Sequence, residues 1–394
     1  MFRSEKFIRK AFGSDMIDSV VEAQKGEDQF SSSVEFVKVE LKHGEVDVVV
    51  KMQSESTLVR DTMSTDVQFH NEVNMYRQIL PYFNSPIVEE LFPKCFFGVS
   101  TLGDYAEDCV VLQNMKTFGY RQSRERFFLD YDHVTLALRR LGAFHSCSYK
   151  AKEADLDGFL KKVNSLKEVY YDLKMRDEMN QYFAPYIERG MVELLKNGEH
   201  TGVLKKFAAR LEDPFTFLKD IVEPEEPIAV LCHGDFCRNN ILFKYEDGRP
   251  IGVSFFDLGT SRYSSPAVDL SFFLFLNVPS QLRKDHWNDF LSAYHEGLSA
   301  SGTKVPSLEM IHAEMQKKAV YAYPHCCAFI PTMMDFERVK VMMAEGDCDL
   351  ASKVTGGDEA AVVVADILRD LVGKQCLGGG KSRYLKRPGG EQCL

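Results

Sequence analysis

The residues best suited to chemistry in this chain lie in two nearby segments, HGDFCRNNILF at positions 233–243 and FFDLG at positions 255–259. The first segment contains Asp235 and Asn240, which are five residues apart. In phosphoryl-transfer sites this offset joins the aspartate that accepts the proton of the attacking hydroxyl to the asparagine that helps to hold Mg²⁺. Asp257, in the second segment, is the candidate for the other metal carboxylate. The pattern therefore predicts transfer of a phosphoryl group from ATP with the help of Mg²⁺.

A predicted β-hairpin explains how these residues would meet. Residues 241–243 are an apolar run, residues 246–248 have the composition of a tight turn, and residues 251–256 would form the returning strand. Because a hairpin brings its two ends together, we expect Asn240 to lie opposite the residue one or two positions before Asp257. A carboxylate, an amide oxygen and the ATP phosphates would suit Mg²⁺. The alternative is an ordinary surface hairpin in which Asp and Asn are loop formers.

An anchor for the ATP phosphates is expected upstream, on a separate sheet. The β-branched run 47–52 carries Lys51, and residues 69–80 have apolar side chains at helical spacing and carry Glu72. In protein-kinase-like folds, a strand lysine pairs with a helix glutamate that steers it onto the phosphates. A surface lysine and a solvated glutamate are the alternative. The order of lysine, glutamate, catalytic loop and metal aspartate along the chain favours the ion pair.

The loop that would cover the phosphates should precede a strand at 34–41. Its sequence, QKGEDQFSSS, contains only Gly26 in place of a glycine-rich run. Ser31, Ser32 and Ser33 are therefore the candidates for donating hydroxyl and amide hydrogens to phosphate, although serine clusters also form plain turns.

Several segments resemble the insect ecdysteroid kinase-like family, a branch of the group that contains choline kinases and aminoglycoside phosphotransferases. They are FHNEVNMYRQILP, LDYDH, LGAFH, HGDFCRNNILF and FFDLGTSRYSSPAVDLSFFL, within a resemblance that runs from about residue 20 to about residue 345. The resemblance implies an α+β, two-lobed protein-kinase-like fold, with a β-rich N-lobe and a mainly helical C-lobe. It also implies ATP-dependent phosphorylation of a hydroxyl on a small molecule, with ecdysteroids as substrates of some members.

When the motifs of the family are matched to this sequence position by position, the resemblance implies the roles that were expected above from the spacing of the residues. Asp235 matches the catalytic aspartate, Asn240 and Asp257 the metal residues, and Lys51 and Glu72 the ion pair. Two departures from the family pattern affect other contacts. Gln113-Asn114 stands where relatives commonly have an acidic pair, and this change affects the expected contacts to the adenine base. FDLG stands where the family more often has a glutamine after the metal aspartate and its neighbour, and this change leaves the metal ligand Asp257 itself in place.

These landmarks predict four parts of the chain. They are an ATP-clamping lobe at 1–111, a hinge at 112–117, a catalytic and acceptor lobe at 118–375 and a disordered, glycine-rich tail at 376–394. Within the hinge, Gln113 and Met115 are assigned to the nucleotide site.

Three residues near the catalytic loop are interpreted as supports rather than as catalysts. His233 is expected to brace the loop of the metal aspartate. Asp269, an acid among apolar neighbours, is expected to cap the catalytic-loop backbone because a buried carboxylate needs hydrogen-bond donors. His145, at the end of a helix predicted over 134–145, is interpreted as a core or capping residue.

Composition limits the function classes. The length of 394 residues and the hydrophobic content of 45% allow a large core. A formal net charge of -10 argues against a nucleic-acid partner. No apolar run is long enough to span a membrane, the start of the chain lacks a long apolar segment for secretion, and the cysteines show no CxxC spacing, so a cytoplasmic protein with reduced thiols is expected. The sequence does not indicate any protein partner.

The acceptor is expected to be a hydroxylated, lipophilic small molecule. Residues 319–334 contain no acid, and residues 270–276 are apolar and rich in phenylalanine. A cationic acceptor would need carboxylates or an aromatic cage, whereas a steroid would need an apolar wall. We predict such a wall with a hydroxyl partner, made by Phe272, Tyr321, Tyr323 and His325. Helix core is the alternative for these residues, and a choline- or aminoglycoside-type kinase and an inactive nucleotide-binding scaffold are the alternatives for the protein.

Overall fold

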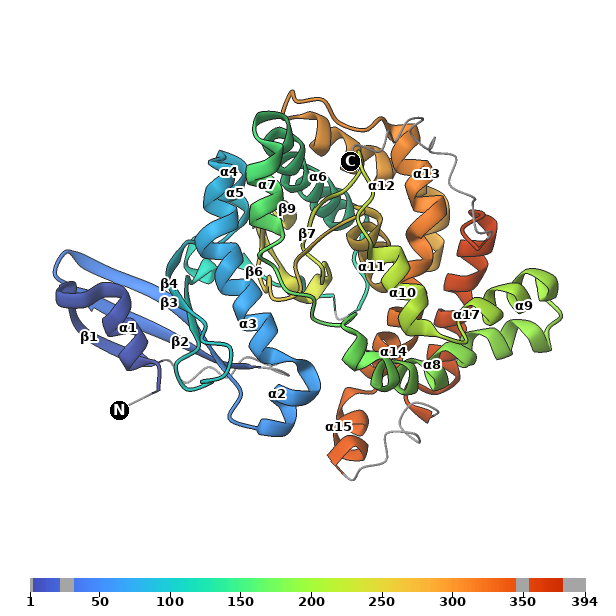
Figure 1. Ribbon diagram of the computed structural model, residues 1–394, viewed down its shortest axis with the longest axis horizontal. Coiled ribbons are helices and arrows are strands. Elements are labelled where there is room, and N and C mark those ends of the chain that lie inside the picture. The colour runs from blue at the N-terminus through green and yellow to red at the C-terminus, as the bar shows by residue number, and fades with distance from the viewer. Residues whose placement is uncertain (1–2, 22–31, 126, 345–353, 378–394) are drawn as a thin grey trace, which may run out of the picture.

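The computed structural model describes residues 3–21, 32–125, 127–344 and 354–377, and these form two lobes (Figure 1). The smaller, N-terminal lobe contains an antiparallel sheet of five strands in the order β1-β2-β3-β5-β4. The strands are β1 (Met16–Val21), β2 (Ser32–Leu41), β3 (Gly44–Gln53), β4 (Cys95–Val99) and β5 (Cys109–Gln113). The helices of this lobe are α1 (Glu5–Phe12), α2 (Thr57–Met63), α3 (Thr65–Asn74), α4 (Leu80–Phe83) and α5 (Pro86–Leu91).

Alternation along β3 decides which side chains face the interior of the site. Val50 and Met52 belong to the apolar cluster that also contains Phe7 and Ile8 of α1. Because successive strand residues point to opposite faces, Lys51 points to the other face of the sheet, where α3 packs. The strand predicted at 47–52 is confirmed as part of β3.

The helix predicted at 69–80 is confirmed, but it begins earlier and is not uniform. It starts at Thr65 as α3, passes through a π-helical turn at Met75–Ile79 and continues as α4. Asp66 lies in its first turn, where an acidic side chain interacts favourably with the helix dipole.

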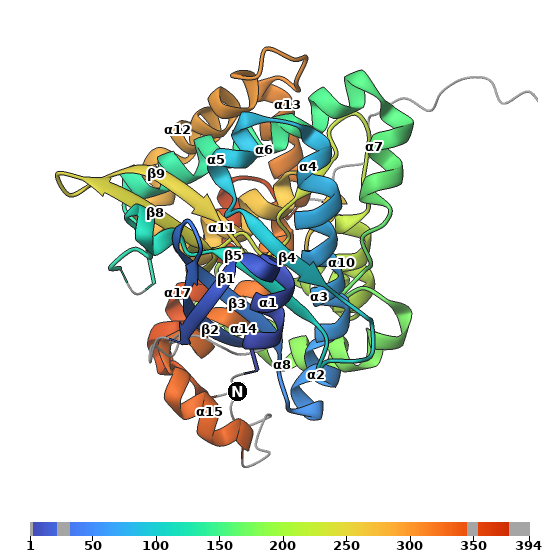
Figure 2. The same ribbon diagram turned by 90° about the vertical axis from the view of Figure 1, so that its left-hand side faces the viewer.

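The larger lobe is mainly helical and carries two small sheets. Strand β7 (Val230–Cys232) pairs with β10 (Arg262–Ser264), and β8 (Ile241–Glu246) lies between β6 (Tyr120–Arg121) and β9 (Arg249–Phe255). Figure 2 shows the β8–β9 hairpin projecting outward from the larger lobe. The helices are α6 (Tyr131–Ala154), α7 (Leu156–Val163), α8 (Arg176–Lys196), α9 (Thr201–Arg210), α10 (Pro214–Val222), α11 (Ala267–Asn277), α12 (Ser280–Ser299), α13 (Leu308–Lys318), α14 (Ala322–Met334), α15 (Phe336–Ala344) and α17 (Gly357–Gly373).

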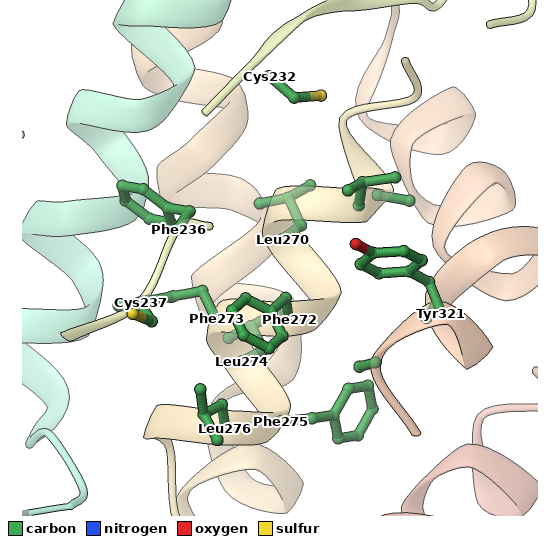
Figure 3. Close-up of a cluster of buried hydrophobic side chains, with 14 of the residues drawn as sticks. Cys232, Phe236, Cys237, Leu270, Phe272, Phe273, Leu274, Phe275, Leu276 and Tyr321 are labelled. Atoms are coloured by element: carbon green, nitrogen blue, oxygen red, sulfur yellow. The ribbon is translucent and has the colours of Figure 1, made fainter. Parts of the chain in front are cut away.

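Helix α11 forms the centre of this lobe, and every one of its residues is buried. Figure 3 shows its phenylalanine and leucine side chains among apolar groups from neighbouring segments. A predominantly apolar helix that is buried on every side belongs in such an interior position, and its single acid, Asp269, is buried with it. The predicted α+β architecture, with a β-rich N-lobe and a mainly helical C-lobe, is confirmed by these two lobes.

Three predicted boundaries differ from the structure. The helix predicted at 134–145 is the longer α6, because residues 146–154 contain neither glycine nor proline to end it. Strand β5 runs to Gln113, so the predicted hinge at 112–117 begins inside the sheet. Cys376 and Leu377, assigned to the tail, are buried, while positions 378–394 lie outside the described residues.

No helix within the described ranges has both the length and the apolar character needed to cross a membrane.

Candidate active site

The catalytic loop, between β7 and β8, holds Asp235 and Asn240 together. The Asn240 amide nitrogen donates to the Asp235 carboxylate at 2.8 Å and to its backbone carbonyl at 2.9 Å. These bonds fix the position of the Asp235 side chain. They also leave the amide oxygen as the atom that Asn240 can offer to a cation.

The hairpin aligns this loop with Asp257, as the sequence predicted. Ile241 pairs with Phe255, and the backbone amide of Phe256 donates to the Asn240 carbonyl at 3.2 Å. Asn240 therefore lies opposite the residue that immediately precedes Asp257. The predicted returning strand at 251–256 is observed as β9, which begins at Arg249, directly after the turn, and ends at Phe255.

Asp257 has a strained backbone, with φ at +64°. Left-handed backbone conformations are unfavourable for residues other than glycine and are concentrated at functional sites. The His233 ring lies 2.9 Å from the carbonyl of Phe256 through its Nε2 atom. His233 therefore braces the segment that carries Asp257, in agreement with its interpretation as a support.

Lys51 connects the two lobes through a pair of carboxylates. Its Nζ atom lies 2.7 Å from Glu72 Oε2 on α3 and 2.7 Å from Asp257 Oδ1. Burial alone would lower the pKa of Lys51, but the negative charges of Asp257 and Glu72 outweigh that effect and raise it. Lys51 thus stays protonated, which is the state required to bind phosphate oxygens.

The carboxylates of Asp235 and Asp257 have pKa values shifted in opposite directions. Burial, followed by the negative charge of Asp257, raises the pKa of Asp235. Burial would also raise the pKa of Asp257, but the charge of Lys51 outweighs it and the pKa is lowered. Two carboxylates separated in this way suit different roles, one as a proton acceptor and the other as a permanently ionised ligand.

Asp269, in the first turn of α11, holds the backbone of the catalytic loop by hydrogen bonds. Its carboxylate accepts the backbone amides of His233 at 2.7 Å and Gly234 at 2.9 Å, and lies 3.2 Å from His145 Nε2. These donors outweigh the effect of burial and lower the pKa of Asp269. The predicted cap is confirmed, and His145 belongs to it from the middle of α6 rather than from a helix end.

Gly234 allows this loop to approach the segment after Asp257. Its φ is +88°, and a Cβ atom built there would lie 2.0 Å from the Thr260 carbonyl oxygen. Any side chain would therefore force the two segments apart.

A model of the ecdysteroid kinase-like family matches residues 26–306, which is more than half of the sequence. This chain belongs to the ecdysteroid kinase-like family. The resemblance recognised in its motifs is thereby confirmed, and the membership supports a kinase that acts on a small molecule. No curated protein sequence matches the chain significantly.

Several solved structures align with this ecdysteroid kinase-like chain at low identity. Choline kinase from Cryptosporidium parvum Iowa II is 12% identical, with 94% of this chain and 96% of that chain covered and a TM-score of 0.49. Spectinomycin phosphotransferase in complex with ADP and spectinomycin is 12% identical, with coverages of 92% and 97% and a TM-score of 0.48. Plasmodium vivax ethanolamine kinase is 13% identical, with coverages of 94% and 90% and a TM-score of 0.43. The assignment rests on the family match.

The sequence did not single out Asn71, which lies next to Glu72 in this family member. Asn71 is fully buried, and its amide nitrogen donates to the carbonyls of Lys167 at 2.8 Å and Gly259 at 3.1 Å. Its amide oxygen accepts the Lys167 backbone amide at 2.8 Å. Asn71 thus ties α3 to the turn after Asp257. A polar residue among the apolar positions of a helix was the available signal.

The remaining nucleotide-side candidates stay predictions. Gly26 and Ser31 lie outside the described residues, and Ser32 is the first residue of β2, paired with Gln53. Gln113 ends β5, where its side-chain oxygen accepts the Lys94 backbone amide at 3.4 Å. Met115 opens a short 3-10 helix, Met115–Phe118, that follows this strand.

Three of the four acceptor candidates lie together. The ring of His325 is 4.5 Å from that of Tyr321 and 5.9 Å from that of Phe272. Figure 3 shows Tyr321 beside α11, with its hydroxyl directed toward that helix. Both nitrogens of His325 already have neighbours, the Tyr321 carbonyl at 3.0 Å and the Tyr171 hydroxyl at 3.3 Å. Burial lowers the pKa of His325 to about 4, so its ring is neutral near pH 7.

Tyr323 does not join this group. It is completely buried, its hydroxyl donates to the Ile187 carbonyl at 2.7 Å, and its ring packs against Phe207. The prediction of a wall that includes Tyr323 is wrong, because a step of two residues along a helix turns the side chain by about 200°.

Proposed function

We propose that this chain is an ATP-dependent small-molecule kinase that transfers the γ-phosphoryl group to a hydroxyl of a lipophilic acceptor, with an ecdysteroid as the candidate acceptor. The observation that carries the proposal is the convergence on Asp257 of Lys51 from β3, Glu72 from α3 and the Asp235–Asn240 pair from the catalytic loop. These are the parts that position a nucleotide and an attacking hydroxyl in phosphoryl transfer.

The residues present suit Mg²⁺ and a nucleotide. Asp257 supplies a carboxylate whose side chain is 37% exposed, while that of Glu72 is only 2% exposed. Asp257 is thus open to a ligand, whereas Glu72 serves to hold Lys51. Asp257 and the amide oxygen of Asn240 would hold Mg²⁺, which offsets the negative charge of the phosphates when bound.

Asp235 would act on the acceptor. Its carboxylate is held by Asn240 and would orient the hydroxyl and accept its proton as the new oxygen–phosphorus bond forms and the bond to the departing ADP oxygen breaks. A pKa raised above the usual value makes this carboxylate a better proton acceptor than an ordinary aspartate. Lys51 would bind the phosphate oxygens, so that catalysis depends on positioning and electrostatics.

A lipophilic acceptor is supported by the apolar group that α11 and the start of α14 form. Phe272, Tyr321 and His325 are buried together, and His325 is neutral. Helix α14 contains no acidic residue that could neutralise a cationic acceptor. These features favour a steroid-like acceptor over choline or an amino sugar.

The test is incubation of the protein with Mg²⁺, ATP and a panel of polyhydroxylated steroids, aminoglycosides and choline, followed by mass spectrometry of phosphorylated products. We expect a phosphorylated steroid that is absent with Asp235→Asn. Phosphorylation of choline or an aminoglycoside alone would overturn the acceptor assignment and keep the kinase. If the protein binds an ATP analogue but neither phosphorylates any compound of the panel nor hydrolyses ATP, the result would support an inactive nucleotide-binding scaffold.

Thermal unfolding supplies an independent reading of acceptor binding. In the presence of Mg²⁺ and a nonhydrolysable ATP analogue, we expect polyhydroxylated steroids to raise the Tm while aminoglycosides and choline leave it unchanged.

A further inference from the structure

Gln53 lies at the end of β3, two residues after Lys51, and it is fully buried. Because the side chains of a strand alternate, Gln53 shares the α3 side of the sheet with Lys51. Its amide nitrogen donates to Asp66 Oδ1 at 2.9 Å, and its amide oxygen accepts the hydroxyl of Thr65 at 2.6 Å. Thr65 and Asp66 are the first two residues of α3. One side chain of β3 therefore holds the start of the helix that carries Glu72.

The same amide group also binds a second, fully buried acid. The Gln53 nitrogen donates to Asp108 Oδ2 at 2.6 Å. The other oxygen of Asp108 accepts the backbone amide and the hydroxyl of Thr101, at 2.6 and 2.9 Å. Asp108 directly precedes β5, and Thr101 follows β4. The Gln53 side chain thus uses its nitrogen and its oxygen together, and it connects α3 to the segments beside β4 and β5.

Helix α3 needs this contact because its own N-terminus lacks a side-chain cap. The N-cap residue is Ser64, which has a left-handed backbone with φ at +50° and, among the described residues, makes no capping hydrogen bond through its side chain. Helix starts are usually held by such a bond. The bonds from Gln53 therefore anchor an end of α3 that its own cap residue does not hold.

The geometry of α3 links the position of its start to that of Glu72. Thr65 and Glu72 are seven residues apart, which is about two helical turns, so their side chains lie on the same face of the helix. Glu72 contacts Lys51 at 2.7 Å. Strand β3 and helix α3 are thus joined at two points on one face, by the amide of Gln53 and by the Lys51–Glu72 ion pair. Because a helix moves as a rigid element, a shift at the first point would disturb the second.

We propose that Gln53 is a positioning residue for phosphoryl transfer, which holds the start of α3 so that Glu72 keeps Lys51 directed at the nucleotide phosphates. The inference rests on the proposed function. Glutamine suits this place because one neutral side chain donates to two carboxylates and accepts a hydroxyl at the same time. A carboxylate there would face two others, and an apolar side chain would remove all three bonds.

Two threonine variants with the same chemical change test the inference by nucleotide binding. Calorimetry measures the affinity of the full-length protein for a nonhydrolysable ATP analogue with Mg²⁺. Thr65→Val removes the hydroxyl bond to Gln53 and should weaken this binding about fivefold, as expected for one hydrogen bond. Thr101→Val removes a hydroxyl bond to Asp108, on the other side of the same network, and should change the affinity by less than about twofold.

A double-mutant cycle shows whether the effect passes through Lys51. Gln53→Leu should weaken binding of the ATP analogue about tenfold in the wild-type protein but less than about twofold in a Lys51→Met background, because the side chain that Gln53 positions is then absent. A merely structural role would give the same loss of affinity in both backgrounds. If Gln53→Leu does not fold, Thr65→Val takes its place in the cycle.

Equal effects of Thr65→Val and Thr101→Val, or a loss that persists in full in the Lys51→Met background, would overturn the inference. The same titrations test the kinase proposal separately. A wild-type protein that does not bind the ATP analogue, or a Lys51→Met variant that binds it as tightly as the wild type, would count against the proposed function itself. Nucleotide binding that depends on Lys51 but not on Gln53 would count against the inference alone.

Discussion

Asp235 and Asp269 both lie at the catalytic loop, yet their carboxylates have different surroundings. Asp269 is 1% exposed and receives two backbone amides and the ring of His145. Asp235 is half-buried, is held by one amide group from Asn240 and is influenced by the negative charge of Asp257. The pKa is lowered at Asp269 and raised at Asp235.

This difference in surroundings distinguishes Asp269, which supports the loop, from Asp235, which is proposed to take part in the reaction. The loop is held in place by a carboxylate whose hydrogen-bonding capacity is filled, while the carboxylate proposed to react keeps capacity for a substrate at some cost to stability. Functional sites commonly carry such unfavourable charges, and the surrounding structure compensates for them. The variants below examine this contrast.

The largest expected effect is on turnover. Asp235→Asn should lower kcat by about 10²- to 10⁴-fold because the amide cannot accept the proton of the hydroxyl. Binding of an ATP analogue, measured by calorimetry, should be nearly unchanged. Asp257→Asn is the matched variant and should weaken Mg²⁺-dependent nucleotide binding as well. Wild-type turnover by Asp235→Asn on a confirmed acceptor would refute its assignment.

Asp269→Asn should act mainly on stability. Replacing the carboxylate weakens bonds to two amides and a histidine, and we expect the free energy of unfolding to fall by about 3 kcal/mol. Urea unfolding of the nucleotide-free protein measures this change. A fully stable variant with lost turnover would instead assign Asp269 to the chemistry.

The pH dependence provides the control for Asp269→Asn. Because the pKa of Asp269 is lowered on folding, its contribution to stability is present above the unfolded pKa of about 3.9 and is lost as the pH falls through the lower folded value. The difference between the wild-type protein and the variant should therefore shrink on acidification below about pH 4. A difference that grew with acid would contradict the hydrogen-bond account.

Asp235→Asn should have the opposite effect on stability. Its raised pKa means that the ionised form is unfavourable in the folded protein near neutral pH. The neutral amide should raise the free energy of unfolding by about 0.5 to 2 kcal/mol in urea titrations of the nucleotide-free protein. A loss of stability as large as that of Asp269→Asn would show that the two carboxylates do not differ as we infer.

The smallest expected effect is at Asn71. Asn71→Ala removes the link between α3 and the turn after Asp257, and kcat/KM should fall roughly fivefold, equivalent to about 1 kcal/mol. Asn74→Ala is the control, since Asn74 is on the same helix and contacts Ser165 at 2.6 Å. Equal effects of the two substitutions would show that Asn71 stabilises the helix without a particular role at the site.

Much of the site could be predicted because its parts are local in sequence. The hairpin follows from an apolar run, a turn and a second run, and its register places Asn240 opposite Phe256, the residue before Asp257. Alternation along β3 likewise determines which face Lys51 occupies. Errors in the predicted ends of the elements also arose from local sequence patterns. The apolar pattern ended at His145, although nothing in the following residues stops α6 before Ala154.

The parts that could not be predicted depend on contacts between distant segments. Tyr321 and Tyr323 are of the same type and two positions apart, but one faces His325 and the other faces Ile187. Asn71 lies inside a segment that resembles the family, yet no role was assigned to it, because its importance comes from partners far away in the sequence.

The sequence by itself determined the order of the candidate site residues and the local geometry around them. Within a hairpin or a strand, short-range backbone geometry fixes the position of a residue from its spacing to its neighbours. Only the tertiary structure decided which polar groups are satisfied. Hydrogen bonds and ion pairs in a core are shared among segments that meet only on folding. The filled hydrogen-bonding capacity of Asp269 and the raised pKa of Asp235 therefore arise only when those segments are packed together.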